Sequence, residues 1–462
     1  MPNGLLKTIT PESALIKKYN VSGPRYTSYP TVPYWSDNPS REQWAEKVRI
    51  AYNGTASGQG ISLYIHLPFC ESLCTYCGCN TRITTNHSVE NPYIRALARE
   101  WKMYLGIFGS RPRISEIHLG GGTPTFFSPS RLEELMDEIL SSSELLPSAE
   151  LSFEAHPNST SLTHLEVLHR LGFRRMSLGI QDFDPRVQAI VNRVQTFGQV
   201  EKVVNHARAT GYNSINFDLI YGLPLQQESS VVGTIEKVNR IRPDRIAFYS
   251  YAHVPWIKPG QRKFTEADLP ADDVKRKLYE SGRRMLEDAG YTEIGMDHFA
   301  LATDALYAAS EKGTLHRNFM GYTASYTGLM IGLGVSAIGD TWDCFAQNVK
   351  KVEDYYRILE NGRLPVFRGH LLDKEDLVLR RHILNIMCRL ETSWGKNDMK
   401  VPVLDDCISR LSEPLSDGLI TLSHSSLRVT GKGKAFLRNI CMAFDARLWR
   451  NIPASEIFSK VV

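Results

Sequence analysis

Four of the eight cysteines of this 462-residue chain lie in one short stretch, at Cys70, Cys74, Cys77 and Cys79. The first three have the spacing C-x3-C-x2-C, which lets three thiolates on one loop wrap around one face of an iron–sulfur cluster. A 4Fe–4S cluster has four irons, each normally held by a cysteine, so three ligands leave one iron open to a small molecule. Only one residue separates Cys79 from Cys77, which makes a fourth bond to the same cluster awkward.

A zinc site is a weaker interpretation of these cysteines. Structural zinc usually needs a second pair of Cys or His further along the chain, and here His66 and His87 stand alone. A disulfide cluster is weaker still, because the first twenty residues carry no secretion signal and a long chain of this kind is expected in the reducing cytoplasm. The other cysteines are scattered and are predicted to be small buried hydrophobic residues: Cys344, Cys388, Cys407 and Cys441.

Composition places the chain among ordinary globular proteins. Hydrophobic residues make up 42% and charged residues 23% of the sequence. The net charge of +4 is small for this length, which argues against bulk nucleic-acid binding but leaves room for a local basic pocket. No apolar run reaches about 18 residues, so no membrane span is expected.

The middle of the chain alternates between β-rich apolar runs and amphipathic helical stretches. The predicted strands are 61–67, 114–119, 150–155, 175–180, 214–220 and 245–251. The predicted helices between them are 91–108, 129–141, 163–171, 199–210 and 229–241. Six βα units imply a parallel sheet with helices outside. Several strands carry polar residues, so we expect a curved sheet, a partial (βα)6 barrel with one face on a wet cavity.

Polar residues and glycines follow the predicted strands at the end where such barrels collect their chemistry. In strand order they are the cysteines, Gly120–Pro124, Glu154, Gln181 with Asp182, Asp218, and Tyr251-Ala252-His253. The run Gly120-Gly121-Gly122 would let the backbone approach a ligand closely, although a tight βα turn explains it equally simply. It lacks the spacing and the acidic partner of a dinucleotide-binding site.

The two ends of the chain differ from this pattern. Residues 1–60 are predicted to form an arm or lid, because Gly23–Pro30 holds two prolines and favours an extended conformation. Residues 61–370 are predicted to form the catalytic domain, in which the glycine-rich run Met330–Ile338 is either a buried strand or a surface for an adenine. Residues 371–462 are predicted to form a mainly helical, winged-helix-like domain, with helices at 375–390, 404–415 and 434–444 around a hairpin at 418–421 and 426–430.

The cysteine spacing, with Tyr76 just before the third cysteine, resembles the signature of the radical S-adenosylmethionine (SAM) superfamily. Over nearly its whole length the chain is similar to one family of that superfamily, the oxygen-independent coproporphyrinogen III dehydrogenases of haem biosynthesis. The family-specific features are the arm at 24–30, the ending Cys77-Gly78-Cys79-Asn80, and the segment at 438–445. Tyr76 stands where phenylalanine is also found in the family.

The resemblance implies a role for each matching residue. Three cysteines would bind the cluster: Cys70, Cys74 and Cys77. Four residues would contact the SAM on the open iron: Tyr64, Gly121, Glu154 and Ile338. A second SAM would be held by Tyr76, Gly122, Thr123, Gln181, Arg193, Asp218 and Ala252. The catalytic residues would be Tyr64, His66, Cys79 and Glu154. For Glu154, Asp218 and Arg193 the alternative is a structural ion pair at the sheet edge.

The implied reaction is the oxidative decarboxylation of two propionate side chains of coproporphyrinogen III to vinyl groups, giving protoporphyrinogen IX. A 5′-deoxyadenosyl radical made from SAM at the 4Fe–4S cluster would start each step. The substrate carries four carboxylates, so basic residues such as Arg25 could anchor it. A flavodoxin or ferredoxin is expected to supply electrons to a monomeric, cytoplasmic enzyme. The alternatives are a haem chaperone on the same scaffold and an anaerobic haem-degrading enzyme.

Overall fold

A twelve-stranded sheet is the centre of the computed structural model, which describes residues 8–453 and 457–461. Its strand order is β16-β15-β14-β13-β1-β4-β5-β6-β7-β8-β10-β9. The six predicted strands are its parallel middle: β1 (Ile61–Leu67), β4 (Arg113–Gly121), β5 (Glu144–Ala155), β6 (Arg175–Gln181), β7 (Ser214–Tyr221) and β8 (Arg245–Ser250). The predicted (βα)6 arrangement is therefore confirmed.

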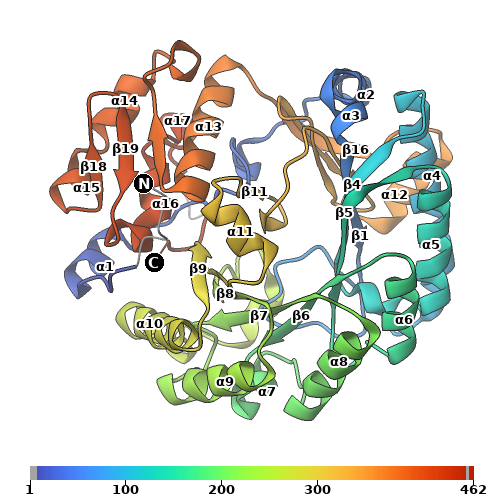
Figure 1. Cartoon of the computed structure of the whole chain (residues 1–462), viewed down its shortest axis with the longest axis horizontal. Helices are drawn as coiled ribbons and strands as arrows, with labels where there is room; N and C mark the ends of the chain where they lie inside the picture. The colour runs from blue at the N-terminus through green and yellow to red at the C-terminus, as the bar shows by residue number, and fades with distance from the viewer. Residues whose placement is uncertain (1–7, 454–456, 462) are drawn as a thin grey trace.

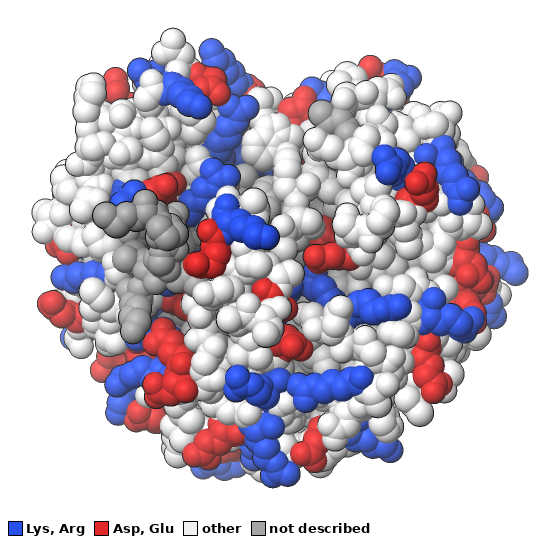
Figure 2. Space-filling view, viewed as in Figure 1, with Lys and Arg blue, Asp and Glu red and all other residues white. Residues whose placement is uncertain are grey.

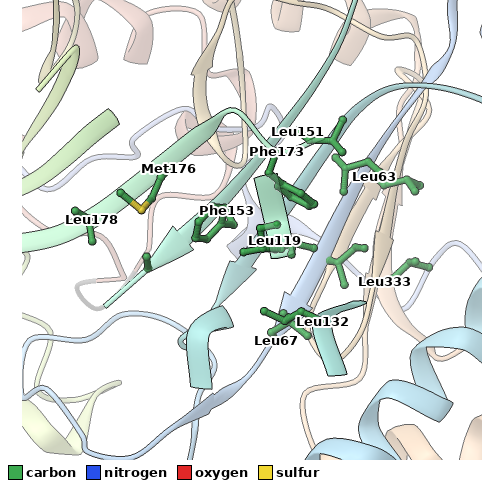
Figure 3. Close-up of a cluster of buried hydrophobic side chains, with 14 of the residues drawn as sticks. Leu63, Leu67, Leu119, Leu132, Leu151, Phe153, Phe173, Met176, Leu178 and Leu333 are labelled. Atoms are coloured by element: carbon green, nitrogen blue, oxygen red, sulfur yellow. The ribbon is translucent and has the colours of Figure 1, made fainter. Parts of the chain in front are cut away.

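The helices of the six units lie on the outer face of the curved sheet (Figure 1). They are α4 (Glu90–Phe108), α5 (Pro129–Ser141), α6 (Leu162–Arg170), α8 (Phe197–Thr210), α9 (Glu228–Ile241) and α10 (Asp272–Asp288). Their apolar stripes pack on the outward side chains of the strands. Figure 3 shows Leu63, Leu119 and Phe153 of neighbouring strands in this core, with Leu132 of α5. Each fully buried leucine or phenylalanine stabilises such a core by roughly 1.5–3 kcal/mol.

The inward face of the sheet is only partly buried. In β6 every second residue is buried and the residues between are half-exposed, and β7 alternates in the same way along most of its length. Because side chains alternate across a strand, one face of each strand packs on the core and the other faces the interior of the barrel. This alternation explains the polar residues that were unexpected for a parallel sheet.

The sheet extends further than the sequence predicted. Beyond β1 it continues through β13 (Met330–Leu333), β14 (Ile338–Asp340), β15 (Cys344–Asn348) and β16 (Val366–Leu371). Beyond β8 it continues through β10 (His298–Ala300) and β9 (Thr292–Gly295). β13 is parallel to β1, and the other added strands pair antiparallel. Of the two interpretations of Met330–Ile338, the buried strand is correct for its first four residues.

The C-terminal residues form helices beside a small sheet, as predicted, with differences in detail. The elements are α13 (Lys374–Arg389), β17 (Glu391–Ser393), α14 (Leu404–Ser409), α15 (Ser412–Ser416), β18 (Ile420–Leu422), β19 (Ser426–Val429), α16 (Leu437–Met442) and α17 (Ala446–Arg450). The hairpin of β18 and β19 is confirmed, and β17 adds an unpredicted third strand. The predicted helix at 404–415 is two short helices, because Pro414 has no N–H to continue the first one.

The N-terminal residues pack against this C-terminal part. The helix α1 (Ser13–Tyr19) shares a second hydrophobic core with α13 and α16, and Figure 1 shows α1 at the edge of this C-terminal part, below α15. The stretch Gly23–Pro30, predicted to be extended, contains no helix, and its Tyr26 and Tyr29 are buried in the same core. The rest of the predicted arm is less extended, since α2 (Arg41–Ala51) packs Trp44 and Val48 into the core of the barrel. The predicted boundaries at residues 60 and 370 stay predictions.

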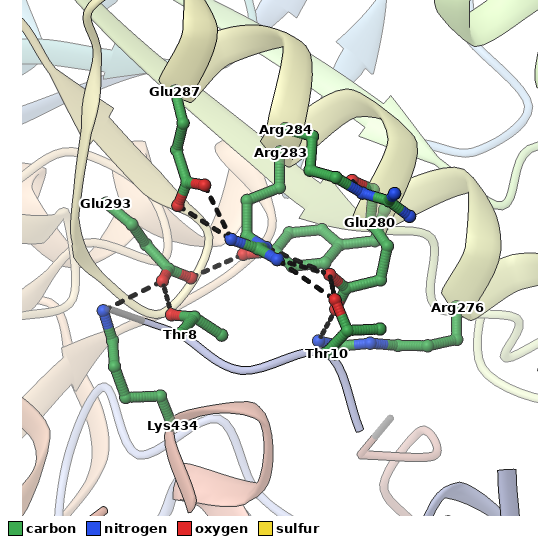
Figure 4. A network of polar contacts seen from close by, with 10 residues as sticks. Thr8, Thr10, Arg276, Glu280, Arg283, Arg284, Glu287, Glu293 and Lys434 are labelled. Atoms are coloured by element: carbon green, nitrogen blue, oxygen red, sulfur yellow. Dashed lines mark hydrogen bonds and ion pairs between the residues drawn. The ribbon is translucent and has the colours of Figure 1, made fainter. Parts of the chain in front are cut away.

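A polar network joins the arm, α10 and the C-terminal part (Figure 4). Glu293 forms an ion pair with Lys434 at 2.9 Å and accepts a hydrogen bond from Thr8. On α10, Arg283 binds Glu280 at 2.7 Å and Glu287 at 2.8 Å. Because these groups are buried together, their pairing is needed to offset the loss of hydration.

Two further properties are the character of the helices with respect to a membrane and the distribution of charge on the surface. In the part of the chain that the structure describes, none of the helices has both the length and the apolar character needed to cross a bilayer. Figure 2 shows positive and negative side chains interspersed on the displayed face, without a broad field of one sign.

Candidate functional site

A cavity of about 680 Å³ opens at the C-terminal ends of the parallel strands. The cysteine loop that follows β1 forms part of its wall. Thirteen of the predicted site residues line it: Cys70, Cys74, Tyr76, Cys77, Cys79, Gly121, Gly122, Thr123, Glu154, Gln181, Arg193, Asp218 and Ala252. Three others, Tyr64, His66 and Ile338, lie outside its lining. The volume is in the range of ligand sites in proteins.

The cysteine loop is fixed at several points by the surrounding chain. Its backbone bonds within the loop, from Cys77 N–H to the Cys74 carbonyl at 3.1 Å. Lys258 donates from Nζ to the Cys79 carbonyl at 3.1 Å, and Asn80 donates from Nδ2 to the Lys350 carbonyl at 3.0 Å. These bonds come from segments far apart in the sequence, so the loop conformation depends on the whole barrel.

The thiols of the loop differ in their environments. A hydrogen bond from Cys79 lowers the pKa of Cys77 to about 6, against the effect of burial. Burial raises the pKa of Cys70 to about 11, although Thr123 at 3.3 Å from its sulfur acts in the opposite direction. Within the described residues, no group of three or more His, Cys, Asp or Glu side chains is placed to hold a single metal ion.

Tyr64 and His66 of β1 form hydrogen bonds that connect this strand to the cysteine loop. The Tyr64 hydroxyl lies 2.9 Å from Nδ1 of His66, and Nε2 of His66 lies 2.8 Å from the carbonyl of Asn80. A carbonyl can only accept, so Nε2 carries the proton and Nδ1 accepts from the tyrosine. Burial lowers the pKa of His66, which keeps the ring neutral. The pair links the strand to the end of the cysteine loop.

The triple glycine is explained by packing against the start of the loop. A Cβ on Gly122 would lie 2.6 Å from the backbone carbonyl carbon and oxygen of Pro68. Gly121 has φ +117°, a conformation that favours glycine, and a Cβ there would meet the His66 ring at 2.8 Å. The N–H of Gly122 bonds the Leu67 carbonyl at 2.8 Å. The tight-turn interpretation is therefore sufficient for these glycines, which also line the cavity.

Glu154 projects into the cavity from the end of β5. It accepts from the Gly121 N–H at 3.1 Å and lies 3.5 Å from Nε2 of His118. Burial opposes ionisation, but the hydrogen bonds from His118 and Gly121 hold the pKa of Glu154 below its ordinary value. A carboxylate kept ionised with its side chain 42% exposed can accept hydrogen bonds from an ammonium group.

Asp218 of β7 lies among neutral partners. It accepts from Ser177 at 2.9 Å and from Nδ2 of Asn216 at 2.9 Å. Burial, and then the charge of Glu154, raise its pKa to about 6. The group therefore carries an ionisation cost that a cationic or hydrogen-bond-donating ligand would relieve.

Arg193 and Gln181 carry polar atoms that the protein leaves without partners. Arg193 donates from Nη2 to the Gly179 carbonyl at 2.5 Å, and its Nη1 lies 3.7 Å from Sγ of Cys74. Its Nε and the Oε1 of Gln181 are buried and have no hydrogen-bond partner among the residues that the structure describes. Gln181 also has φ +66°, a strained conformation for this residue. Unpaired buried groups and backbone strain are typical of a site built for a polar ligand.

Among the described residues, Arg193 and Asp218 form no ion pair, whereas Glu154 lies 3.5 Å from His118, so the alternative of a structural ion pair stays open for Glu154 alone. Three neighbours of these acids were missed from the sequence: His118, Ser177 and Asn216. Asn216 and Asp218 are two positions apart on one strand, and Ser177 lies opposite Asn216 in the sheet register. The period of two along the strands was the signal that could have found them.

Comparisons with known proteins agree on one assignment. The sequence model of the radical SAM superfamily matches residues 64–238. The chain is 37% identical to the oxygen-independent coproporphyrinogen III oxidase of Escherichia coli over 97% of this chain and 98% of that protein. It is 38% identical to the protein of the same name from Pseudomonas aeruginosa, over 99% of this chain and all of the other. The chain belongs to the oxygen-independent coproporphyrinogen III oxidase family.

The solved structures support this family assignment. The structure of coproporphyrinogen III oxidase from Escherichia coli, described as a radical SAM enzyme, superimposes with a TM-score of 0.89 at 35% identity. The superposition covers 96% of this chain and the whole of that one. The similarity therefore extends through the arm, the barrel and the C-terminal helices, and is not limited to the cysteine loop.

The donor set fits the cluster and SAM that radical SAM enzymes use. Three cysteines of one loop supply the sulfur ligands that iron–sulfur clusters require. Beside them, Gln181 Oε1 and Arg193 Nε are buried polar atoms that lack partners in the described part of the chain. Such atoms favour a ligand with both donors and acceptors, as an amino acid moiety provides.

Proposed function

We propose that this chain catalyses the oxygen-independent oxidative decarboxylation of two propionate side chains of coproporphyrinogen III to vinyl groups, giving protoporphyrinogen IX. The observation that carries the proposal is the full-length similarity to enzymes of this name, in sequence and in structure. A match to the superfamily alone would identify the cofactor chemistry and leave the substrate open.

Cys70, Cys74 and Cys77 are proposed to hold a 4Fe–4S cluster. Glu154, ionised at the cavity wall, would accept hydrogen bonds from the amino group of SAM beside the cluster. When bound, the cluster and SAM supply a reducing electron and an organic radical that can remove a hydrogen atom from an unactivated carbon. The protein holds these groups together, and the hydrogen bonds of Tyr64 and His66 to one another and to Asn80 would fix the cysteine loop that carries the cluster.

A second SAM is proposed at the other side of the cysteine loop. Arg193 would pair with its carboxylate through the Nε that has no partner in the protein. Asp218 would accept from its amino or ribose groups, which removes the cost of a buried carboxyl group. Tyr76, Gly122, Thr123, Gln181 and Ala252 line the same cavity and are proposed to complete this site.

The remaining proposals concern the electron donor, the cellular compartment and the oligomeric state. We propose a small one-electron carrier, flavodoxin or ferredoxin, as the reductant, because a cluster accepts one electron at a time. All eight cysteines are free thiols, which is compatible with the reducing cytoplasm. A monomer is proposed because the chain itself supplies every residue assigned to the site.

The test is an anaerobic incubation of reconstituted protein with coproporphyrinogen III, SAM, a reductant and an electron acceptor, followed by chromatography of the tetrapyrroles. The expected products are a monovinyl intermediate, then protoporphyrinogen IX, with two CO2 and about two 5′-deoxyadenosine for each substrate. Tight haem binding without vinyl products would support the chaperone, and ring-opened haem would support the haem-degrading enzyme.

A further inference from the structure

A second group of charges lies at the β8 side of the cavity. Arg25 of the N-terminal arm lines the cavity, and its side chain is 29% exposed. Its Nη2 donates to the carbonyl of Ser250, at the end of β8, at 2.6 Å. Its Nη1 is 3.8 Å from Oδ2 of Asp297, at the outer limit of an ion pair. The guanidinium of Arg25 therefore faces the cavity, and its positive charge forms a weak ion pair with Asp297.

Three more cations surround the same carboxylate. Arg317 and Arg438, like Arg25, favour the ionised form of Asp297, whose pKa burial nevertheless raises. Lys275 donates from Nζ to the carbonyl of Tyr251 at 3.1 Å, and Tyr251 lines the cavity. Among the described residues, none of these three cations forms an ion pair within 4 Å of a carboxylate. Positive charge thus exceeds negative charge around Asp297.

Burial and the excess of positive charge around Asp297 lower the pKa of two of these cations. Burial, and then the charges of Arg25 and Arg438, lower the pKa of Lys275 to about 8. Burial, and then the charge of Arg25, lower the pKa of Arg438 to about 9. Like charges brought together away from water destabilise one another, and an anion placed among them would relieve the repulsion.

The arm is held so that Arg25 faces the cavity. Arg438 donates from Nε to the carbonyl of Pro24 at 2.9 Å, and it also bonds the carbonyl of Gly23. Arg317 donates from Nη2 to the carbonyl of Arg25 at 3.4 Å, while its Nε and Nη1 are buried without partners. These two arginines therefore fix the backbone on both sides of the Arg25 side chain.

The other cations on the cavity wall are turned toward the cysteine loop. Arg193 lies against Cys74, and Lys258 bonds the Cys79 carbonyl. The cavity thus has a cofactor side, where the cations contact the loop, and a β8 side, where Arg25 is the lining cation. An anionic group of a ligand that extends away from the loop would meet Arg25.

We propose that Arg25, with Lys275 adding charge behind it, binds a propionate carboxylate of the substrate, and that Arg438 and Arg317 position the arm for this contact. The proposal rests on the proposed function, because it takes its ligand from the tetracarboxylate substrate. In the free protein Asp297 serves as the weak internal counter-ion of Arg25. The substrate carboxylate would take the place of Asp297 and would bind the guanidinium through two parallel hydrogen bonds.

The test measures binding of coproporphyrin III, the oxidised and stable tetrapyrrole with the same four propionates, by fluorescence titration of the full chain under anaerobic conditions. Arg25→Gln is expected to weaken binding at least tenfold, and Lys275→Met by a smaller factor. Asp297→Asn removes the internal competitor and is expected to tighten binding. If Asp297 only fixed the arm, its removal would weaken binding, so this variant separates a ligand site from a structural ion pair.

Three controls keep the result specific. Arg363→Gln, which changes an exposed arginine elsewhere on the surface, should bind as the wild type does. The tetramethyl ester of coproporphyrin III lacks the carboxylates and should bind the wild type and Arg25→Gln equally. SAM binding, measured by equilibrium dialysis, should be unchanged in Arg25→Gln, whereas a selective loss of SAM binding would assign Arg25 to the cofactor and overturn the proposal.

Failure of this inference is distinguishable from failure of the proposed function. If the wild type forms vinyl products and Arg25→Gln binds coproporphyrin III as tightly as the wild type, the carboxylate site is wrong and the function stands. If Arg25 is needed for binding but no vinyl product forms, the site stands and the function is wrong. Wild-type protein that does not bind coproporphyrin III overturns the site.

Discussion

The two ends of the same parallel strands use buried charges in opposite ways. At the end remote from the cysteine loop, Arg245 and Asp304 pair at 2.5 Å with side chains only 5% and 2% exposed. At the cavity end, the hydrogen-bond donors to Asp218 among the described residues are neutral, and its pKa is raised to about 6. The residue types are the same, and their neighbours differ. A close counter-ion marks the charges that hold the barrel together, and the lack of one marks those available to a ligand.

The largest effect is expected from the thiol ligands at the cavity end. Cys70→Ser, Cys74→Ser or Cys77→Ser should each abolish the cluster and all activity, because a serine hydroxyl is a poor ligand for these irons. Cys79→Ser should keep about four irons per chain. Iron analysis and absorption spectra of anaerobically reconstituted protein give the answer. Loss of iron in Cys79→Ser together with retention in one of the other three would overturn the ligand assignment.

At the opposite end, removing one member of the close Arg245–Asp304 ion pair should reduce stability. Asp304→Ala leaves the buried Arg245 without a counter-ion and also removes acceptors for Ser214 and for the Leu306 N–H. The free energy of unfolding should fall by about 3–5 kcal/mol, as measured by denaturant titration. Adding Arg245→Met should recover part of the loss, since the uncompensated charge is then gone. A loss below about 1 kcal/mol would show that this pair is not structural.

Asp218→Asn should have the opposite effect to Asp304→Ala. Function should be lost, and the free energy of unfolding should be unchanged or higher. The raised pKa means that folding favours the protonated acid, so the ionised carboxyl lowers stability above pH 6 and ceases to do so as the pH falls toward 4. The asparagine variant without ligands should therefore gain about 1–2 kcal/mol at pH 8 and nothing near pH 4.

The functional side of this variant is measured separately. Binding of the second SAM should weaken about ten- to a hundredfold, because a charged hydrogen-bond acceptor becomes a neutral one. Stoichiometry by equilibrium dialysis distinguishes one bound SAM from two. A destabilised Asp218→Asn with unchanged SAM binding would place Asp218 with the structural charges and remove the distinction between the two ends.

The smallest effect is expected at Tyr76. Tyr76→Phe keeps the ring on the cavity wall and removes only the hydroxyl, which hydrogen-bonds the Cys74 thiol. Loss of one such neutral bond should change activity by less than about fivefold. Tyr76→Ala, the matched variant without a ring, should be far less active in the same steady-state assay. Equal effects in both variants would mean that the hydroxyl, and not the ring, is the contributing group.

The sequence predicted the middle of the fold better than its edges. The six parallel strands follow from a regular alternation of apolar runs and amphipathic helices, which is local information. β13 was only one of two interpretations of its segment, and β9, β10 and β14–β16 were missed because they are short and carry little of the regular alternation of the middle strands. The division of 404–415 into two helices could have been read from Pro414.

The site was predicted where spacing alone is informative. The cysteine loop needs only C-x3-C-x2-C, and Glu154, Gln181 and Asp218 stand at strand ends. The pairing of charges was not predictable, because Asp304 and Asp218 look alike until their neighbours are known. The sequence also left the triple glycine undecided, because the positive φ of Gly121 and the close approach of Gly122 to Pro68 depend on the folded chain.

The bond between Arg438 and the Pro24 carbonyl joins residues 414 positions apart in the chain. During translation the cysteine loop and the first strands leave the ribosome long before Arg438 does. A nascent chain can therefore fold its cysteine loop while the arm that carries Arg25 still lacks its anchor. The order of synthesis would complete the cofactor side of the cavity first and the β8 side last, so that a partly made polypeptide offers no finished pocket to a tetrapyrrole.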